Sequence, residues 1–234
     1  MIELKLYKED GTIKTREEFI SDVEALYDEA TSSVDTEDMA RLLKITTCSE
    51  TQIDTKRAYE TFNFLSKNFY IDDEITQETA TDFYKFVEYW NDIALEDEDP
   101  IVVYINSPGG DLEAAFSIIA TMEQSKIPVN TVIIGRAWSA AFLIAISGDH
   151  RSSLKYSSFL YHEGSAYYEA DAHKYLQFSK YYENILLKNM ETCILANTHI
   201  DGSTYESHRK DDWWIDTKSA LQYGIIDEIK EDAK

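Results

Sequence analysis

The sequence predicts an α/β fold built around one β-α-β unit between residues 101 and 146. Two apolar runs rich in β-branched residues, 101–105 and 129–134, have the length and character of strands buried in a parallel sheet. Between them, residues 112–122 place apolar side chains at helical spacing, so one face of a helix can cover the sheet. Strands and helices continue to alternate after this unit, which indicates a mostly parallel sheet.

The first 58 residues are predicted to form an N-terminal extension, and residues 59–234 the main domain. Residues 2–13 alternate apolar and polar side chains around a turn, which is typical of a hairpin. Helical spacing then predicts helices over 15–30 and 36–45. The polar, unperiodic stretch 46–58 is interpreted as the boundary.

The main domain is expected to begin with short strands over 62–65 and 69–71. Thr76 can then cap a helix, which acidic residues and Pro100 end before the strand at 101. The apolar stripe of this helix consists of Ala80, Phe83, Val87, Trp90 and Ala94.

The C-terminal half continues the alternation of strands and helices. A buried strand over 158–161 ends at His162, and a long helix is predicted over roughly 171–196. A short helix over 204–211 follows. Asp216 can cap a helix over 217–223 that Gly224 stops, and residues 225–229 close the domain as a strand.

The chain is strongly acidic, with 44 Asp and Glu residues against 22 Lys and Arg and a net charge of −22. This balance excludes binding to a nucleic-acid backbone, which needs a basic surface. Its two cysteines, Cys48 and Cys193, indicate a reducing compartment rather than a disulfide framework. The N-terminus lacks the apolar core of a signal peptide, and the longest apolar stretch, 140–146, is too short to cross a bilayer. We therefore expect a cytoplasmic protein with neither nucleic-acid nor membrane partners.

Both strand-to-helix turns of the central unit carry groups suited to acyl transfer. Residues 107–110, Ser-Pro-Gly-Gly, leave backbone amides exposed beside two glycines, and Ser139 places a hydroxyl at the start of the next helix. Donor amides and a hydroxyl at neighbouring strand ends are the parts of such a site. The glycine pair lacks the Lys-Ser/Thr of a phosphate-binding loop, and no recurring spacing of metal ligands is present.

Three residues are candidates for the chemistry, although each also has a structural interpretation. Ser139 can be a nucleophile, a helix cap or a small packing residue. His162, directly after a buried strand, can be a general base or a satisfied structural histidine. Asp212, followed by two tryptophans, can be a partly dry carboxylate that orients an imidazole or an exposed acid in an acidic protein.

Four motifs in the right order resemble the ClpP family of self-compartmentalising serine proteases over about residues 62–230. Residues 104–110, Tyr-Ile-Asn-Ser-Pro-Gly-Gly, match the family's oxyanion strand and loop. Residues 135–139, Gly-x-Ala-x-Ser, resemble the nucleophile motif, and 158–162 the strand that leads to the base. Residues 212–214 and 220–227 resemble the C-terminal signature with its orienting acid.

The resemblance implies a crotonase-like β-α-β spiral and a serine endopeptidase that cleaves unfolded or unfoldase-delivered polypeptides. Ser139 would be the nucleophile, His162 its base and Asp212 the orienting acid, with the amides of Gly110 and Ala140 as the oxyanion hole. The subunits would assemble into homo-oligomeric, usually heptameric, rings served by an AAA+ unfoldase. ATP would be used only by that partner, and this chain would need no cofactor. Because the base must be neutral, activity is expected to fall below about pH 6–7.

The chain departs from the family's usual pattern at several positions. Trp138 stands where a small residue usually precedes the nucleophile; its indole can narrow the substrate pocket or pack in the core, and we favour packing. Ala140 and Ala141 replace Met-Gly, yet any non-proline residue supplies the amide. Residues 163–168 contain one glycine and no proline where the family has a glycine-rich strand, and Asp211 replaces an arginine. The family uses these last two features in ring pairing, so single and double rings both stay open.

Two other functions are compatible with the sequence. The chain can be a catalytically inactive ring or scaffold subunit, although inactive paralogues usually lose a member of the triad. It can also be another enzyme on the same fold, such as an acyl-CoA hydratase or a peptidase with a Ser-Lys dyad. Lys155 is the nearest lysine downstream of Ser139 for such a dyad.

Overall fold

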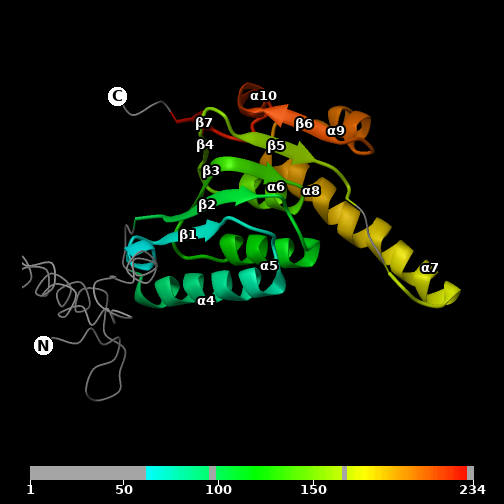
Figure 1. Cartoon of the computed structure of the whole chain (residues 1–234), viewed down its shortest axis with the longest axis horizontal. Coiled ribbons are helices and arrows are strands. Elements are labelled where there is room, and N and C mark those ends of the chain that lie inside the picture. The colour runs from blue at the N-terminus through cyan, green and yellow to red at the C-terminus, as the bar shows by residue number, and fades with distance from the viewer. Residues whose placement is uncertain (1–61, 95–98, 165–167, 231–234) are drawn as a thin grey trace, which may run out of the picture. The chain divides into compact units, whose positions relative to one another are not determined.

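The computed structural model describes residues 62–94, 99–164 and 168–230 (Figure 1). The hairpin and the two helices predicted for the N-terminal extension lie outside these residues. The chain divides into two compact units, Met1–Ser66 and Lys67–Lys234. The second unit holds all the strands described below.

Within the described residues, seven strands form one sheet. The strands are β1 (Asn68–Ile71), β2 (Ile101–Ser107), β3 (Val129–Trp138), β4 (Arg151–Ser153), β5 (Ser158–Tyr161), β6 (Trp213–Asp216) and β7 (Glu228–Ile229). The strands β1, β2, β3, β4 and β7 pair in that order, and all these pairs are parallel. The C-terminal part of β3 pairs with β5, also parallel, and β6 runs antiparallel to β5. The predicted α/β fold with a mostly parallel sheet is confirmed.

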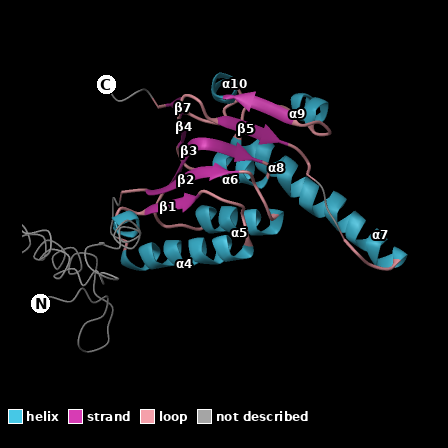
Figure 2. Cartoon of the chain, viewed as in Figure 1, coloured by secondary structure: helices cyan, strands magenta, loops and turns pink. Residues whose placement is uncertain are grey.

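Helices connect the strands and cover the sheet (Figure 2). They are α4 (Gln77–Ile93), α5 (Leu112–Glu123), α6 (Ala140–Ile146), α7 (Ala172–Tyr181), α8 (Leu187–Asn197), α9 (Gly202–His208) and α10 (Thr217–Gln222), with a π-helical segment η1 (Tyr182–Leu186) between α7 and α8. Helices α4 and α5 pack against each other, and α6 packs against β3 and α8. No helix in the described ranges has both the length and the apolar character that crossing a membrane requires.

The core forms where the sequence pattern is strongest. All seven residues of α6 are buried, and β2 alternates buried with half-buried side chains. Thr76 caps α4 as predicted, because its side chain accepts a hydrogen bond from the amide of Thr79. The β2-α5-β3 segment confirms the predicted β-α-β unit.

Five points of the predicted secondary structure were wrong or incomplete. Residues 62–65 are helical rather than extended, a common ambiguity for a short apolar run. The long helix over 171–196 is interrupted by the π-helical segment, and the last strand covers only Glu228–Ile229. Strand β4 was not predicted, because Arg151–Ser153 is polar although Ser152 and Ser153 are buried. Strand β6 was not predicted, because its aromatic start was interpreted as the end of the short helix before it.

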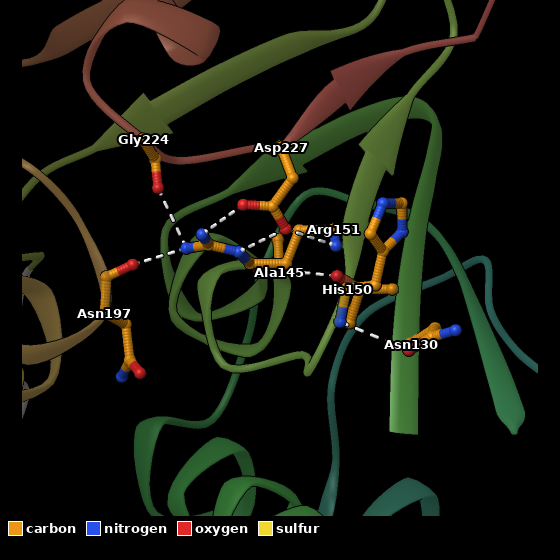
Figure 3. Close-up of polar contacts among 8 residues, drawn as sticks. Asn130, Ala145, His150, Arg151, Asn197, Gly224 and Asp227 are labelled. Atoms are coloured by element: carbon orange, nitrogen blue, oxygen red, sulfur yellow. Dashed lines mark hydrogen bonds and ion pairs between the residues drawn. The ribbon is translucent and has the colours of Figure 1, made fainter. Parts of the chain in front are cut away.

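Arg151, at the start of β4, joins three segments of the C-terminal half (Figure 3). Its guanidinium donates to both carboxylate oxygens of Asp227, at 2.6 and 3.1 Å. It also donates to the carbonyl oxygens of Asn197, at the end of α8, and Gly224, after α10. Burial would raise the pKa of the Asp227 carboxyl, but the hydrogen bonds from Arg151 outweigh burial and hold this pKa below its usual value.

Candidate active site

The candidate residues follow strands that end at one edge of the sheet. Ser107, the last residue of β2, pairs with Ala137 of β3. Trp138, the last residue of β3, pairs with Leu160 of β5. The turns after these three strands are therefore neighbours, as expected for the carboxyl ends of parallel strands.

Ser139 has a backbone conformation that residues other than glycine rarely adopt. Its φ is 55° and its ψ is −122°, and its amide donates a 2.8 Å hydrogen bond to the carbonyl oxygen of Leu160. Such a conformation costs on the order of 1–3 kcal/mol in a non-glycine residue and is concentrated at functional sites. Although Ser139 precedes α6, its side chain makes no capping hydrogen bond. Ser139 therefore stands at the N-cap position of α6 without capping the helix through its hydroxyl.

Gly109 brings the turn after β2 into contact with Ser139. A Cβ atom at this glycine would lie 2.6 Å from the carbonyl oxygen of Trp138, 2.8 Å from the Cβ of Ser139 and 3.1 Å from the amide nitrogen of Ala140. The φ of Gly109 is also 100°, which disfavours any residue with a side chain. The local geometry therefore requires glycine at this position.

Two backbone amides beside this contact have no acceptor among the described residues. The amide of Gly109 donates to the Ser107 hydroxyl, and that of Asp111 donates to the carbonyl oxygen of Ile75, which leaves the amide of Gly110 between them. Ala140 is the first residue of α6, so its amide has no intrahelical acceptor. These amides can donate to an anionic oxygen near Ser139.

His162 and Asp212 meet because β5 and β6 are antiparallel. Tyr161 pairs with Trp213, so the residues one step beyond each strand also face each other. The Nδ1 atom of His162 lies 3.4 Å from Oδ1 of Asp212. The Asp212 side chain is 63% exposed, so the prediction that the tryptophans keep it partly dry is wrong. No hydrogen bond joins the Ser139 hydroxyl to His162 in the described part of the chain; catalytic hydrogen bonds are often longer before substrate binds.

Trp138 packs beside the nucleophile position. Its indole Nε1 donates a 3.0 Å hydrogen bond to the Ser158 hydroxyl. Its ring meets that of Trp214 edge to face, with centroids 5.1 Å apart, and the Arg136 guanidinium lies 5.0 Å from its centroid. These contacts favour the packing interpretation of Trp138.

Lys155, two further histidines and the metal-ligand residue types are the alternative candidates for this edge. Lys155 lies between β4 and β5, at the end of β5 opposite His162, so a Ser139–Lys155 dyad is not assembled. His208 stacks on Trp213 with ring centroids 4.1 Å apart, and His150 lies beside Arg151. The described residues contain no group of three His, Cys, Asp or Glu side chains that could hold a metal ion.

Two contacts made by the chain neighbours of His162 were not predicted from the sequence. The carboxylate of Glu163 accepts a 2.7 Å hydrogen bond from Nε of Arg209, and the hydroxyl of Tyr161 donates to that of Tyr205 at 3.0 Å. The only sequence signal for the ion pair was the opposite charge of its two residues: Glu163 directly follows His162, and Arg209 lies three residues before Asp212.

The sequence of the chain is similar to those of proteins from one known family. A family model described as Clp protease matches residues 53–233. The chain belongs to the Clp protease family. It is 34% identical over 152 residues to the ATP-dependent Clp protease proteolytic subunit of Streptococcus mutans, which covers 59% of this chain and 72% of that protein. It is 30% identical over 168 residues to the ATP-dependent Clp protease proteolytic subunit 2 of Borreliella burgdorferi, covering 71% of this chain and 83% of the relative. The predicted Clp-type fold and family are therefore confirmed.

Proposed function

We propose that this chain is a serine endopeptidase of the ClpP type, which cleaves unfolded or unfoldase-delivered polypeptides to short peptides. The observation that carries the proposal is the strained backbone of Ser139, with φ 55°, in contact with Gly109 and with a hydroxyl that caps nothing. A strained residue persists only where its surroundings enforce it, and a hydroxyl that makes no capping hydrogen bond at a helix start suits a nucleophile.

In this proposal each residue of the sheet edge has one role. Oγ of Ser139 attacks the peptide carbonyl while His162 takes its proton, and the amides of Gly110 and Ala140 stabilise the oxyanion. His162 then protonates the leaving amine, and an acyl-enzyme remains on Ser139. Water, deprotonated by His162, attacks the ester and releases the second peptide with the serine restored. Asp212 orients the imidazole and stabilises its charged form.

The family also supports a proposal about assembly and partners. The relatives are named as proteolytic subunits of ATP-dependent Clp proteases. We infer a homo-oligomeric ring served by an AAA+ unfoldase, which consumes the ATP, with no cofactor in this chain. A polypeptide that pairs as an added strand would be gripped mainly by its backbone, which gives broad sequence tolerance.

Fluorophosphonate labelling followed by intact-mass spectrometry tests the proposal. The sample is the purified full chain, with its oligomeric state measured in the same buffer. One adduct on the wild type and none on Ser139→Ala is the expected result. Equal labelling of the two proteins would rule out Ser139 as the nucleophile.

A second candidate function is a non-catalytic ring subunit. The absence of a Ser139–His162 hydrogen bond in the described residues and the exposure of Asp212 favour it. A wild-type ring that never forms an adduct and never cleaves an unfolded protein would establish this function in place of the protease.

A further inference from the structure

Helix α9 and the residue after it contact both chain neighbours of His162. On one side, the hydroxyl of Tyr161 donates to that of Tyr205 at 3.0 Å, and both side chains are buried. On the other side, the Glu163 carboxylate accepts from Arg209 at 2.7 Å. The hydroxyl of Tyr182 also donates to the backbone carbonyl of Glu163 at 2.6 Å. The backbone that carries His162 is therefore fixed before and after the histidine.

The same helix also leads to Asp212. Arg209 directly follows α9, and only Lys210 and Asp211 separate it from Asp212. His208, the last residue of α9, stacks on Trp213, with ring planes 12° apart. The chain between Arg209 and Trp213 is thus held at both ends, and Asp212 lies within it.

The contact between His162 and Asp212 cannot by itself hold the two groups in place. It is 3.4 Å long, and the side chains are 33% and 63% exposed. Ion pairs at this exposure are typically worth about 0–1 kcal/mol. In contrast, the Glu163–Arg209 pair is shorter, and its side chains are 20% and 26% exposed. The hydrogen bond to Glu163 is the main reason that the pKa of Arg209 is raised.

We propose that Glu163 and Arg209 form a positioning pair that holds His162 and Asp212 in the geometry needed to activate Ser139. This inference rests on the proposed protease function. Neither residue touches the reacting atoms: the pair joins the segment after the base to the segment before the acid. Misplacement of a catalytic group by about 1 Å can lower a rate about 100-fold, so a pair at this junction affects the chemistry.

The pair also sets the charge near His162. Among the described residues, Asp212 lies 3.4 Å from His162, and Glu163 follows the histidine on its own segment. Arg209, directly after α9, pairs with Glu163 and with Glu206 of α9. Lys188 and Glu191 of α8 interact electrostatically with Tyr205. Loss of Arg209 leaves the Glu163 carboxylate unneutralised, which favours a charged imidazole. Loss of the Glu163 charge leaves Arg209 with only the exposed Glu206 carboxylate, 3.5 Å away, and this weaker neutralisation disfavours a charged imidazole. If the pair only stabilised the fold, the two variants would not change the charge of the imidazole in opposite directions.

The test measures the second-order rate constant for fluorophosphonate labelling of Ser139 as a function of pH. The variants are Arg209→Gln, Glu163→Gln and the charge reversal Glu163→Arg with Arg209→Glu, each confirmed to form the same oligomer. Each single variant is expected to label about tenfold more slowly. The acid limb of the profile moves to higher pH in Arg209→Gln and to lower pH in Glu163→Gln, by a few tenths of a pH unit. The reversal restores most of the rate.

Glu206→Gln is the matched control, because it removes a carboxylate that also contacts Arg209, at 3.5 Å, but lies 61% exposed on α9. It is expected to label at the wild-type rate. The positioning role is overturned if the single variants label like the control, or if both shift the profile in the same direction and the reversal restores nothing. A wild type that does not label at all would instead refute the protease proposal itself.

Discussion

Gly109 lies so close to Ser139 that a Cβ atom on the glycine would come within 2.8 Å of the serine's Cβ. Gly109→Ala must therefore displace either the turn after β2 or the nucleophile. We expect labelling of Ser139 by a fluorophosphonate to slow about 100-fold, as for a catalytic group moved by about 1 Å.

The control for this variant is Gly202→Ala, because a Cβ atom at Gly202 meets nothing within 4 Å. Its labelling rate is expected to equal that of the wild type, and its unfolding temperature to be unchanged or slightly higher. A Gly109→Ala protein that labels as fast as Gly202→Ala would show that the close contact is not needed for reactivity.

Asp212→Asn keeps the size of the side chain but removes the charge 3.4 Å from Nδ1 of His162. We expect the rate of peptide hydrolysis to fall roughly 10³-fold, toward the loss seen when a triad acid becomes an amide. Asp211→Asn, an exposed neighbour, should hydrolyse the same peptide at the wild-type rate. Equal rates for the two variants would remove Asp212 from the proposed mechanism.

Arg151→Met tests the junction that joins β4 to the C-terminal segments. The change leaves the Asp227 carboxylate and the carbonyl oxygens of Asn197 and Gly224 without the guanidinium. We expect the free energy of unfolding to fall by about 2–3 kcal/mol, since hydrogen bonds to charged groups are lost. Urea unfolding at a fixed protein concentration measures this loss.

Lys85→Met is the matched control for Arg151→Met, because Lys85 forms an ion pair with Asp82 whose side chains are 69% and 58% exposed. Its effect should stay below about 0.5 kcal/mol. Equal effects of the two changes would mean that the Arg151 junction adds no more stability than a surface pair.

The Asp227 carboxyl gives the junction a defined pH dependence. Because Arg151 holds the pKa of this carboxyl below that of the unfolded chain, which is about 3.9, the ionised pair stabilises the fold above about pH 4. This contribution is lost as the pH falls through the lower, folded-state pKa. The stability difference between wild type and Asp227→Asn should therefore be constant from pH 5 to 7 and shrink below about pH 4. A difference that grows on acidification would contradict the assignment.

The spacing of apolar residues was enough to predict the centre of the fold, because β2, α5 and β3 each have the apolar spacing and length typical of a strand or a helix. It failed at residues 62–65, where a short apolar run suits a helix or a strand equally. It also failed at β4, where buried serines carry no apolar signal. Strand β4 takes its conformation from its pairing with β3 and β7 rather than from its own sequence.

The candidate site was predictable to different degrees. The conformation of Ser139 is a consequence of the turn after β3, and the glycine pair marked the turn beside it. The meeting of His162 with Asp212 depends on β6, which sequence pattern did not reveal, so only the family resemblance pointed to it. The Glu163–Arg209 pair joins residues 46 positions apart, and no local rule links them.

Strand β4 is completed along one side by β7, which lies 76 positions later in the chain. During synthesis on the ribosome, β4 emerges long before its partner, and its backbone groups on that side stay unpaired until Glu228–Ile229 has been made. The nascent chain thus carries an open strand edge for most of the time that the C-terminal half is translated. Folding of this edge is necessarily a late event, and chains released early would be the ones most prone to aggregate.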